Sequence, residues 1–366
     1  MAKISNTFSF VGEFASALDK DKNKVGVKEI GKSAWKGKVL EFVIKANGQQ
    51  QRVKMFGGHS GDKIEVNSKQ KDEKGKTIKL EIPFSKRFEQ SVIDSVSPYS
   101  ITKVGDKQFI SIEDAIDYIG MNISEFEGKK FKVTGKVKTE TYTSKTGESV
   151  ITVKFEAQNI FNVRDTDVEG FNGQMAMFIT SETLNKEKTI EDIVKDKKVV
   201  LDVYFEEYNS DKNTKEAVPI LYYPYSVVVN ISDKFDIKNK LHVDKLNMIL
   251  DTFKVDGEDV YEMGYGVRFF NGAESKPITL DELTDFEKRK IELGYETLES
   301  IAKSKEGMSE FKNEIQVKME FNPKYTNGTE KTDISKSSLS VIIEKTETAP
   351  KEEVKKEVVT EDSDLF

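Results

Sequence analysis

The sequence lacks cysteine and holds only two histidines, His59 and His242, among 366 residues. The absence of cysteine excludes disulfide frameworks, thiolate zinc sites, iron–sulfur clusters and cysteine nucleophiles. Two histidines are also too few for a His-rich metal site. No apolar run approaches the roughly 20 residues that span a bilayer, and the first residues do not resemble a secretory signal. We therefore expect no cofactor, no membrane contact and a cytoplasmic location.

Arginine is scarce among the basic residues. Only 5 of the 57 basic residues are Arg, and the remainder are Lys. Proteins that read base sequence depend on bidentate Arg contacts. A Lys-dominated protein that binds nucleic acid therefore holds the phosphate backbone without reading much sequence. Codon bias is the alternative explanation for the excess of lysine.

The net charge of −7 conceals a basic segment. Residues 1–110 carry 21 Lys+Arg and 13 Asp+Glu, a net +8, whereas residues 111–235, 236–345 and 346–366 carry −6, −5 and −4. Such asymmetry favours a nucleic-acid contact in the basic segment and a separate acidic tail. An ordinary solvated surface is the alternative.

Period-2 alternation predicts a mainly β chain, α+β overall. The chain also repeats a strand pattern: the aromatic-x-apolar-x-Gly-x-apolar spacing of residues 8–14 returns at residues 131–137, and two further strand patterns follow in the same order. A glycine within a strand marks a bulge or bend that lets a sheet curl. The repeat predicts two related small barrels, at residues 1–110 and 111–235, with Ser111 capping a short helix between them.

The last third of the chain has a different pattern. Residues 236–345 predict a mixed α/β region of unclear role, with a helix at 243–253, a long helix at 279–303 that Thr279 caps, and strands at 314–321 and 338–344. Residues 346–366 are short, charged and without an apolar core. They predict a disordered acidic tail.

The chain ends in a cluster of acids followed by two apolar residues: Glu361, Asp362, Ser363, Asp364, Leu365 and Phe366. Here the chain resembles the single-stranded-DNA-binding proteins of bacteria and their phages. Those proteins join an oligonucleotide-binding (OB) barrel to a flexible linker and an acidic tip that ends in Phe. This chain has Leu365 where the family usually places Pro.

The resemblance implies a function and partners. It implies that the two barrels are OB-like, and that the protein coats and protects single strands in DNA replication and DNA recombination. It also implies that the tip recruits replication and repair proteins, because a terminal Phe fills an apolar pocket and the acids steer encounter with a basic partner.

The basic segment interleaves cations with aromatic rings. Arg52, Lys54 and Phe56 share one strand parity, opposite Val53 and Met55. Single strands are held by cations that follow the phosphates and rings that stack on the bases. We expect at least two of its Trp and Phe residues at 35, 84 and 88 to be exposed, although core packing is the alternative for any one of them. The candidate set in this segment is Trp35, Lys36, Lys38, Arg52, Lys54, Phe56, Phe84, Lys86, Arg87 and Phe88.

The second repeat carries a cationic stripe. Lys130, Lys132, Lys136 and Lys138 share one parity. We expect a weaker binding site there, because the surrounding charge is negative and residues 174–178 lack the cations of residues 52–56. A solvated strand face is the alternative.

Two other classes of function stay open at this point. The first is a phage structural protein or protein-interaction module built from β-barrels. The second is a metal-dependent nucleic-acid enzyme that uses Asp165 and Asp167, although a turn suits these residues better. The preferred hypothesis is a non-enzymatic, sequence-nonspecific protein that binds single-stranded DNA, with RNA as an alternative ligand.

Overall fold

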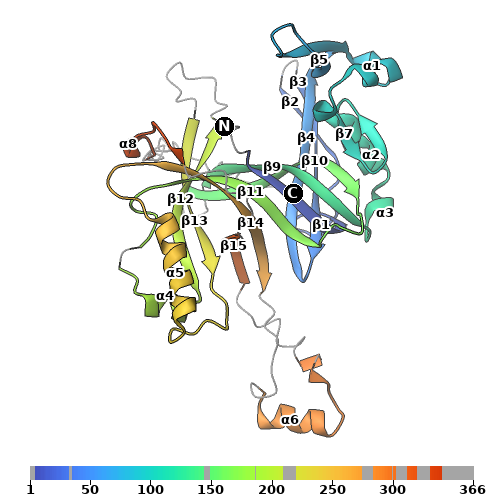
Figure 1. Ribbon diagram of the computed structural model, residues 1–366. Helices are drawn as coiled ribbons and strands as arrows, with labels where there is room; N and C mark the ends of the chain where they lie inside the picture. The colour runs from blue at the N-terminus through green and yellow to red at the C-terminus, as the bar shows by residue number, and fades with distance from the viewer. Residues whose placement is uncertain are drawn as a thin grey trace, which may run out of the picture.

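The computed structural model describes residues 5–32, 35–143, 149–185, 187–208, 220–273, 283–298, 300–301, 311–319 and 330–339. The fold is mainly β with packed helices, as predicted, and one 16-stranded sheet runs through it (Figure 1). Within the described ranges, no helix is long and apolar enough to cross a membrane.

Five strands close into a first barrel, barrel A: β1 (Thr7–Ser16), β3 (Trp35–Ala46), β4 (Gln49–Ser60), β9 (Lys130–Thr143) and β10 (Ser149–Asn162). β1 pairs with β3 and β9, β3 pairs with β4, and β9 pairs with β10, all antiparallel. β4 and β10 close the barrel in parallel. A five-stranded barrel in which the third and fifth strands run parallel has the OB topology.

A second barrel, barrel B, repeats this topology with β11 (Gly170–Ile179), β12 (Lys198–Tyr208), β13 (Ile220–Asn230), β14 (Tyr261–Ala273) and β15 (Phe311–Val317). β11 pairs with β12 and β14, β12 with β13, and β14 with β15, all antiparallel. β13 and β15 run parallel, as β4 and β10 do. The chain therefore contains two OB-like barrels.

The barrel boundaries differ from those that the sequence predicts. β9 and β10 lie after residue 110, yet they complete barrel A, and the region 236–345 supplies the last two strands of barrel B. The repeated motifs are neighbours rather than counterparts: Phe8 pairs with Gly135 and Phe131 pairs with Gly12. A Cβ on either glycine would collide with a backbone carbonyl of the next strand. The shared glycine therefore reflects crowding inside barrel A, of Gly12 against β3 and of Gly135 against β10.

Each barrel has helices between its third and fourth strands. In barrel A these are α2 (Ile112–Met121) and α3 (Ile123–Phe126), and in barrel B the helix is α5 (Lys240–Phe253). The Ser111 side chain accepts a hydrogen bond from the Glu113 amide, so the predicted N-cap is confirmed. α4 (Ile190–Asp196) follows β11 and starts with a capping box.

An inserted arm, residues 61–110, joins β4 to α2 and stands at the upper right of Figure 1. It has its own small core of Val66, Ile82, Val96, Ile101 and Ile110. Its elements are β5 (Lys63–Lys71), β6 (Thr77–Pro83), η1 (Phe84–Lys86), α1 (Gln90–Ser95), η2 (Pro98–Ser100), β7 (Thr102–Val104) and β8 (Lys107–Phe109). A further strand, β2 (Lys28–Lys32), lies outside the arm and pairs with β3.

The two barrels share one core. β1 pairs antiparallel with β11, so the sheet continues from barrel A into barrel B. The Phe269 ring of barrel B lies 5.8 Å from the Phe10 ring and 4.8 Å from the Phe155 ring of barrel A, measured between centroids. The two barrels therefore pack as one body.

The predicted elements near the C-terminus are only partly present. The long helix expected at 279–303 is α6 (Asp285–Glu292), which Thr284 caps, and the chain turns at Gly294, where φ is +75°. Residues 338 and 339, expected in a strand, belong to α8 (Lys336–Leu339), which follows β16 (Glu330–Lys331). The remainder of that expected strand, the tail and the tip lie outside the described residues.

Candidate nucleic-acid interface

The alternation predicted for β4 is confirmed. Val53 and Met55 are fully buried in barrel A, whereas Arg52 and Phe56 are exposed and Lys54 is partly exposed. Residues opposite each other on paired strands lie on the same face, and β3 pairs with β4 along its length. We call the outward surface formed by Trp35, Glu41, Arg52, Lys54 and Phe56 the β3–β4 face.

An aromatic platform forms one end of the β3–β4 face. A Cβ added to Gly37 or Gly58 would collide with the Trp35 indole, so the indole lies directly against the backbone of both strands. The Phe56 ring lies 5.7 Å from the indole at an interplanar angle of 35°. Phe56 keeps 38% of its surface exposed. Two half-open rings side by side offer a stacking surface for bases.

Cations adjoin the platform. The Lys54 ammonium lies 4.8 Å from the centroid of the Phe56 ring. Arg52 Nε donates a hydrogen bond to Glu41 at 3.0 Å. By register Lys54 stands between Glu41 and Glu156 of the neighbouring strands, but no ion pair of Lys54 is present in the part of the chain that the structure describes. Exposed ion pairs contribute little, so a phosphate can compete for both cations.

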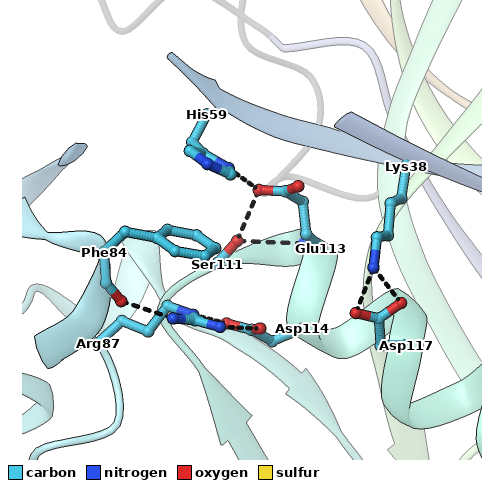
Figure 2. A network of polar contacts seen from close by, with 8 residues as sticks. All are labelled: Lys38, His59, Phe84, Arg87, Ser111, Glu113, Asp114 and Asp117. Atoms are coloured by element: carbon cyan, nitrogen blue, oxygen red, sulfur yellow. Dashed lines mark hydrogen bonds and ion pairs between the residues drawn. The ribbon is translucent and has the colours of Figure 1, made fainter. Parts of the chain in front are cut away.

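Lys36 and Lys38 do not join the β3–β4 face. They sit on the opposite strand parity from Trp35, and Lys38 Nζ binds both carboxylate oxygens of Asp117 on α2, at 2.6 and 2.7 Å (Figure 2). This hydrogen bond raises the pKa of Lys38. Although adjacent in sequence, Trp35 and Lys36 point to different sides because side chains alternate along a strand.

Arg87 and Phe84 belong to a second network, which holds the inserted arm on α2 (Figure 2). Arg87 donates to Asp114 at 2.7 and 3.0 Å and to the Phe84 carbonyl at 2.6 Å. Phe84 stacks on His59 at 3.9 Å between centroids, and the Nδ1 atom of His59 lies 2.6 Å from a Glu113 carboxylate oxygen. Arg87 and Phe84 are therefore fixed by contacts within the protein.

Only part of the exposure expected for the aromatic residues is found. Phe88 is 62% exposed, whereas Trp35 and Phe84 are half-buried. Lys86 is exposed beside Phe88 on the arm. The acids at 113, 114 and 117 were not predicted as a feature of the site. Their spacing puts them on neighbouring positions of one helix. This cluster of acids in the sequence could have predicted that nearby cations are paired.

Most of the lysine stripe is also paired. It lies on β9 of barrel A, where Lys130 binds Glu169 at 2.6 Å, Lys132 binds Asp167 at 2.5 Å and Lys138 binds Glu207 at 2.7 Å. Lys136 is exposed, and no ion pair of its side chain occurs among the residues described. The stripe therefore offers one open cation rather than four.

The Asp167 carboxylate takes part in an ion pair with Lys132 and in a turn. Its carboxylate accepts a hydrogen bond from the Arg164 amide at 3.0 Å in addition to the Lys132 contact, and these contacts lower its pKa. In the ranges that the structure covers, no group of three or more His, Asp or Glu side chains is arranged to hold a metal ion.

A groove of about 590 Å³ separates the β3–β4 face from barrel B. We call it the inter-barrel groove. Barrel A and barrel B both contribute to its wall, with Arg52, Lys54, Tyr142 and Lys154 on one side and Tyr225, Asn271 and Asn313 on the other. The β3–β4 face and the groove therefore share Arg52 and Lys54.

Comparisons with known proteins give few matches. No family model matches the chain, and no curated protein matches it. Among solved structures, a deletion mutant of the single-stranded DNA binding protein from Thermus aquaticus matches with a TM-score of 0.30 and 10% identity, covering 73% of this chain and 86% of that chain. A TM-score this low does not support the fold, which rests on the strand pairing described above.

Proposed function

We propose that this protein is a non-enzymatic single-stranded-DNA-binding protein that acts without sequence preference through the β3–β4 face. The observation that carries the proposal is the Trp35–Phe56 platform with Lys54 beside it on an open face of an OB-like barrel. In OB barrels the second and third strands form the surface that binds oligonucleotides, and β3 and β4 are these two strands.

The chemistry of the face suits a ligand of any sequence. Stacking on an aromatic ring contributes about 1–3 kcal/mol per base and does not depend on base identity. Lys54 and Arg52 supply charge for the phosphates, and the shortage of Arg elsewhere leaves few groups that could read base edges. The chemistry of this face and the resemblance of the C-terminal tip together support a role in coating and protecting single strands during replication and recombination, for example those of a phage.

The test is a titration of a labelled dT strand with the protein, monitored by fluorescence anisotropy at several salt concentrations. The strand has about 30 nucleotides, a length above the range that one OB barrel covers. Trp35 is the only tryptophan, so its emission reports directly on the β3–β4 face. We expect tight binding that weakens with salt, quenched Trp35 emission, and much weaker binding of a duplex. An RNA strand of the same length measures the preference between DNA and RNA. Absence of binding at low salt would contradict the proposal.

The proposal includes recruitment of partner proteins by the C-terminal tip, which lies outside the described residues. The acids Glu361, Asp362 and Asp364 would steer a basic partner, and Leu365 and Phe366 would supply the apolar anchor. A pull-down with residues 346–366 as bait tests this part. Removal of the last two residues should abolish capture, and capture that survives this truncation would exclude the proposed anchor.

A further inference from the structure

We propose that the inter-barrel groove receives the bases that follow those on the β3–β4 face, so that one single strand contacts both barrels. This inference rests on the proposed function. The two surfaces are continuous because Arg52 and Lys54 line the groove and also belong to the face. Phe56 and Arg52 are four residues apart on β4, about 13 Å at the rise of a strand. A strand that stacks on Trp35 and Phe56 and continues along β4 therefore arrives at the groove.

The groove is held open by contacts between the barrels. Asn271 Nδ2 of β14 donates to the Gln50 carbonyl at 3.0 Å, and Gln51 Nε2 donates to the Phe269 carbonyl at 3.3 Å. These bonds and the shared aromatic core fix the separation of the two walls. The volume of about 590 Å³ lies within the range of about 300–1,000 Å³ that pre-formed sites for small molecules show.

The lining suits unpaired bases. Tyr142 is 52% exposed at the groove and available for stacking. The Tyr225 ring packs 5.4 Å from Phe205, and its hydroxyl can donate a hydrogen bond. The exposed side chain of Asn313 adds an amide group to the lining, whereas the amide nitrogens of Gln51 and Asn271 are engaged in the contacts between the barrels. Amides and hydroxyls are the groups that hydrogen-bond to base edges.

The charge in the groove separates bases from phosphates. Lys154 is exposed and joins Arg52 and Lys54. The groove is also lined by four acids, Glu41, Glu140, Glu156 and Glu314, of which Glu41 pairs with Arg52 and Glu314 with Lys198. The lining as a whole is therefore not basic. The phosphates stay beside Lys54 and Lys154, and the bases enter the inter-barrel groove.

The experiment measures anisotropy with the full-length protein and two dT strands, of about 8 and about 30 nucleotides, because one OB barrel covers roughly 4–16 nucleotides. Tyr142→Ala should weaken binding of the longer strand about tenfold, since one stacked base is worth roughly 5- to 150-fold. The shorter strand, which the β3–β4 face can hold alone, should lose less. The salt dependence should keep its slope, because no phosphate contact is removed.

Tyr99→Ala is the matched control, because Tyr99 is 98% exposed and lies on the inserted arm, away from the groove lining. Asn313→Ala, at another exposed position, is a second groove variant with an expected loss in the same direction. If both groove variants bind the longer strand as Tyr99→Ala does, while the strand still quenches Trp35, the inference is overturned and the proposed function stands. A loss accompanied by a smaller salt slope would assign the groove to phosphates and overturn the inference. Failure of the unmodified protein to bind or to quench would instead refute the proposed function.

Discussion

The two barrels have the same strand order but present different surfaces on their second and third strands. In barrel A, β3 and β4 carry Arg52 and Lys54 beside the exposed ring of Phe56. In barrel B, β12 and β13 carry a single cation, Lys198 at the start of β12, which is paired with Glu314. The outward side of β12 instead carries Asp202, which accepts a hydrogen bond from Ser226 at 2.6 Å.

The face of barrel B is also covered. Tyr222 of β13 packs 5.2 Å from Phe178 and belongs to a small apolar cluster with Leu339 of α8. Lys336 of α8 binds Glu182 at 2.6 Å and so holds this segment down. The comparison shows that a shared barrel topology does not imply a shared ligand, because the function depends on which side chains each outward face carries.

The largest expected effect on DNA binding comes from removing the aromatic platform of barrel A. Trp35→Leu and Phe56→Leu should each weaken dT binding by about 1–3 kcal/mol, because each loses one stacked base. Anisotropy titrations measure the change. The matched variant in barrel B is Tyr204→Leu, which should bind as the unmodified protein does. Equal losses in the two barrels would abolish the distinction between their faces.

The largest expected effect on stability comes from the contact between α2 and the inserted arm of barrel A. α2 anchors the inserted arm through Asp114 and the largely buried Arg87. Asp114→Ala should lower the free energy of unfolding by about 2–3 kcal/mol, because it leaves Arg87 without its charged acceptor. Urea unfolding measures the change. Glu65→Ala, which breaks an exposed ion pair with Lys79, should change the stability by less than about 0.5 kcal/mol. A similar change in both variants would show that the α2 network has no special role.

A smaller effect is expected from the cation beside Phe56. Lys54→Gln should reduce the salt slope of dT binding by about one unit, because one phosphate contact is lost. The same titration with Lys38→Gln should leave the slope unchanged, since Lys38 is bound to Asp117. If Lys38→Gln alters the slope as much as Lys54→Gln does, the strand follows the α2 side of barrel A.

The smallest expected effect lies on the acidic face of barrel B. Asp202→Asn removes a negative charge without adding a positive one and should change dT affinity by less than about 0.5 kcal/mol. A binding curve recorded beside that of the unmodified protein is sufficient. A clear gain in affinity would mean that the strand passes close to β12, contrary to the contrast between the faces.

Much of the fold could be predicted from the sequence because local patterns indicate where strands and helices begin and which side of a strand is buried. Alternation around Val53 and Met55 identified the inner and outer sides of β4, and Ser111 marked the start of α2. The barrel boundaries could not be predicted in this way. Closure depends on pairings such as Phe8 with Gly135, which are far apart in sequence, and local periodicity contains no information about which strands pair.

The candidate site was predicted in part for the same reason. The row of Arg52, Lys54 and Phe56 follows from strand parity alone. The pairing of Lys38 and Arg87 with acids of α2 depends on how the helix packs against the barrel end, which spacing within one strand does not determine. The indole of Trp35 lies over Gly37 and Gly58, and only the register of β3 on β4 brings the second of these glycines beneath it.

The most direct test of the central claim is to locate the strand on the protein. A dT strand carrying photoreactive 5-iodouracil, irradiated in complex with the full-length protein and analysed by mass spectrometry, reports the rings that lie against the bases. The account predicts cross-links to Trp35 or Phe56. Cross-links concentrated on Tyr204 or elsewhere on the outward face of barrel B, with neither of these two residues modified, would contradict it.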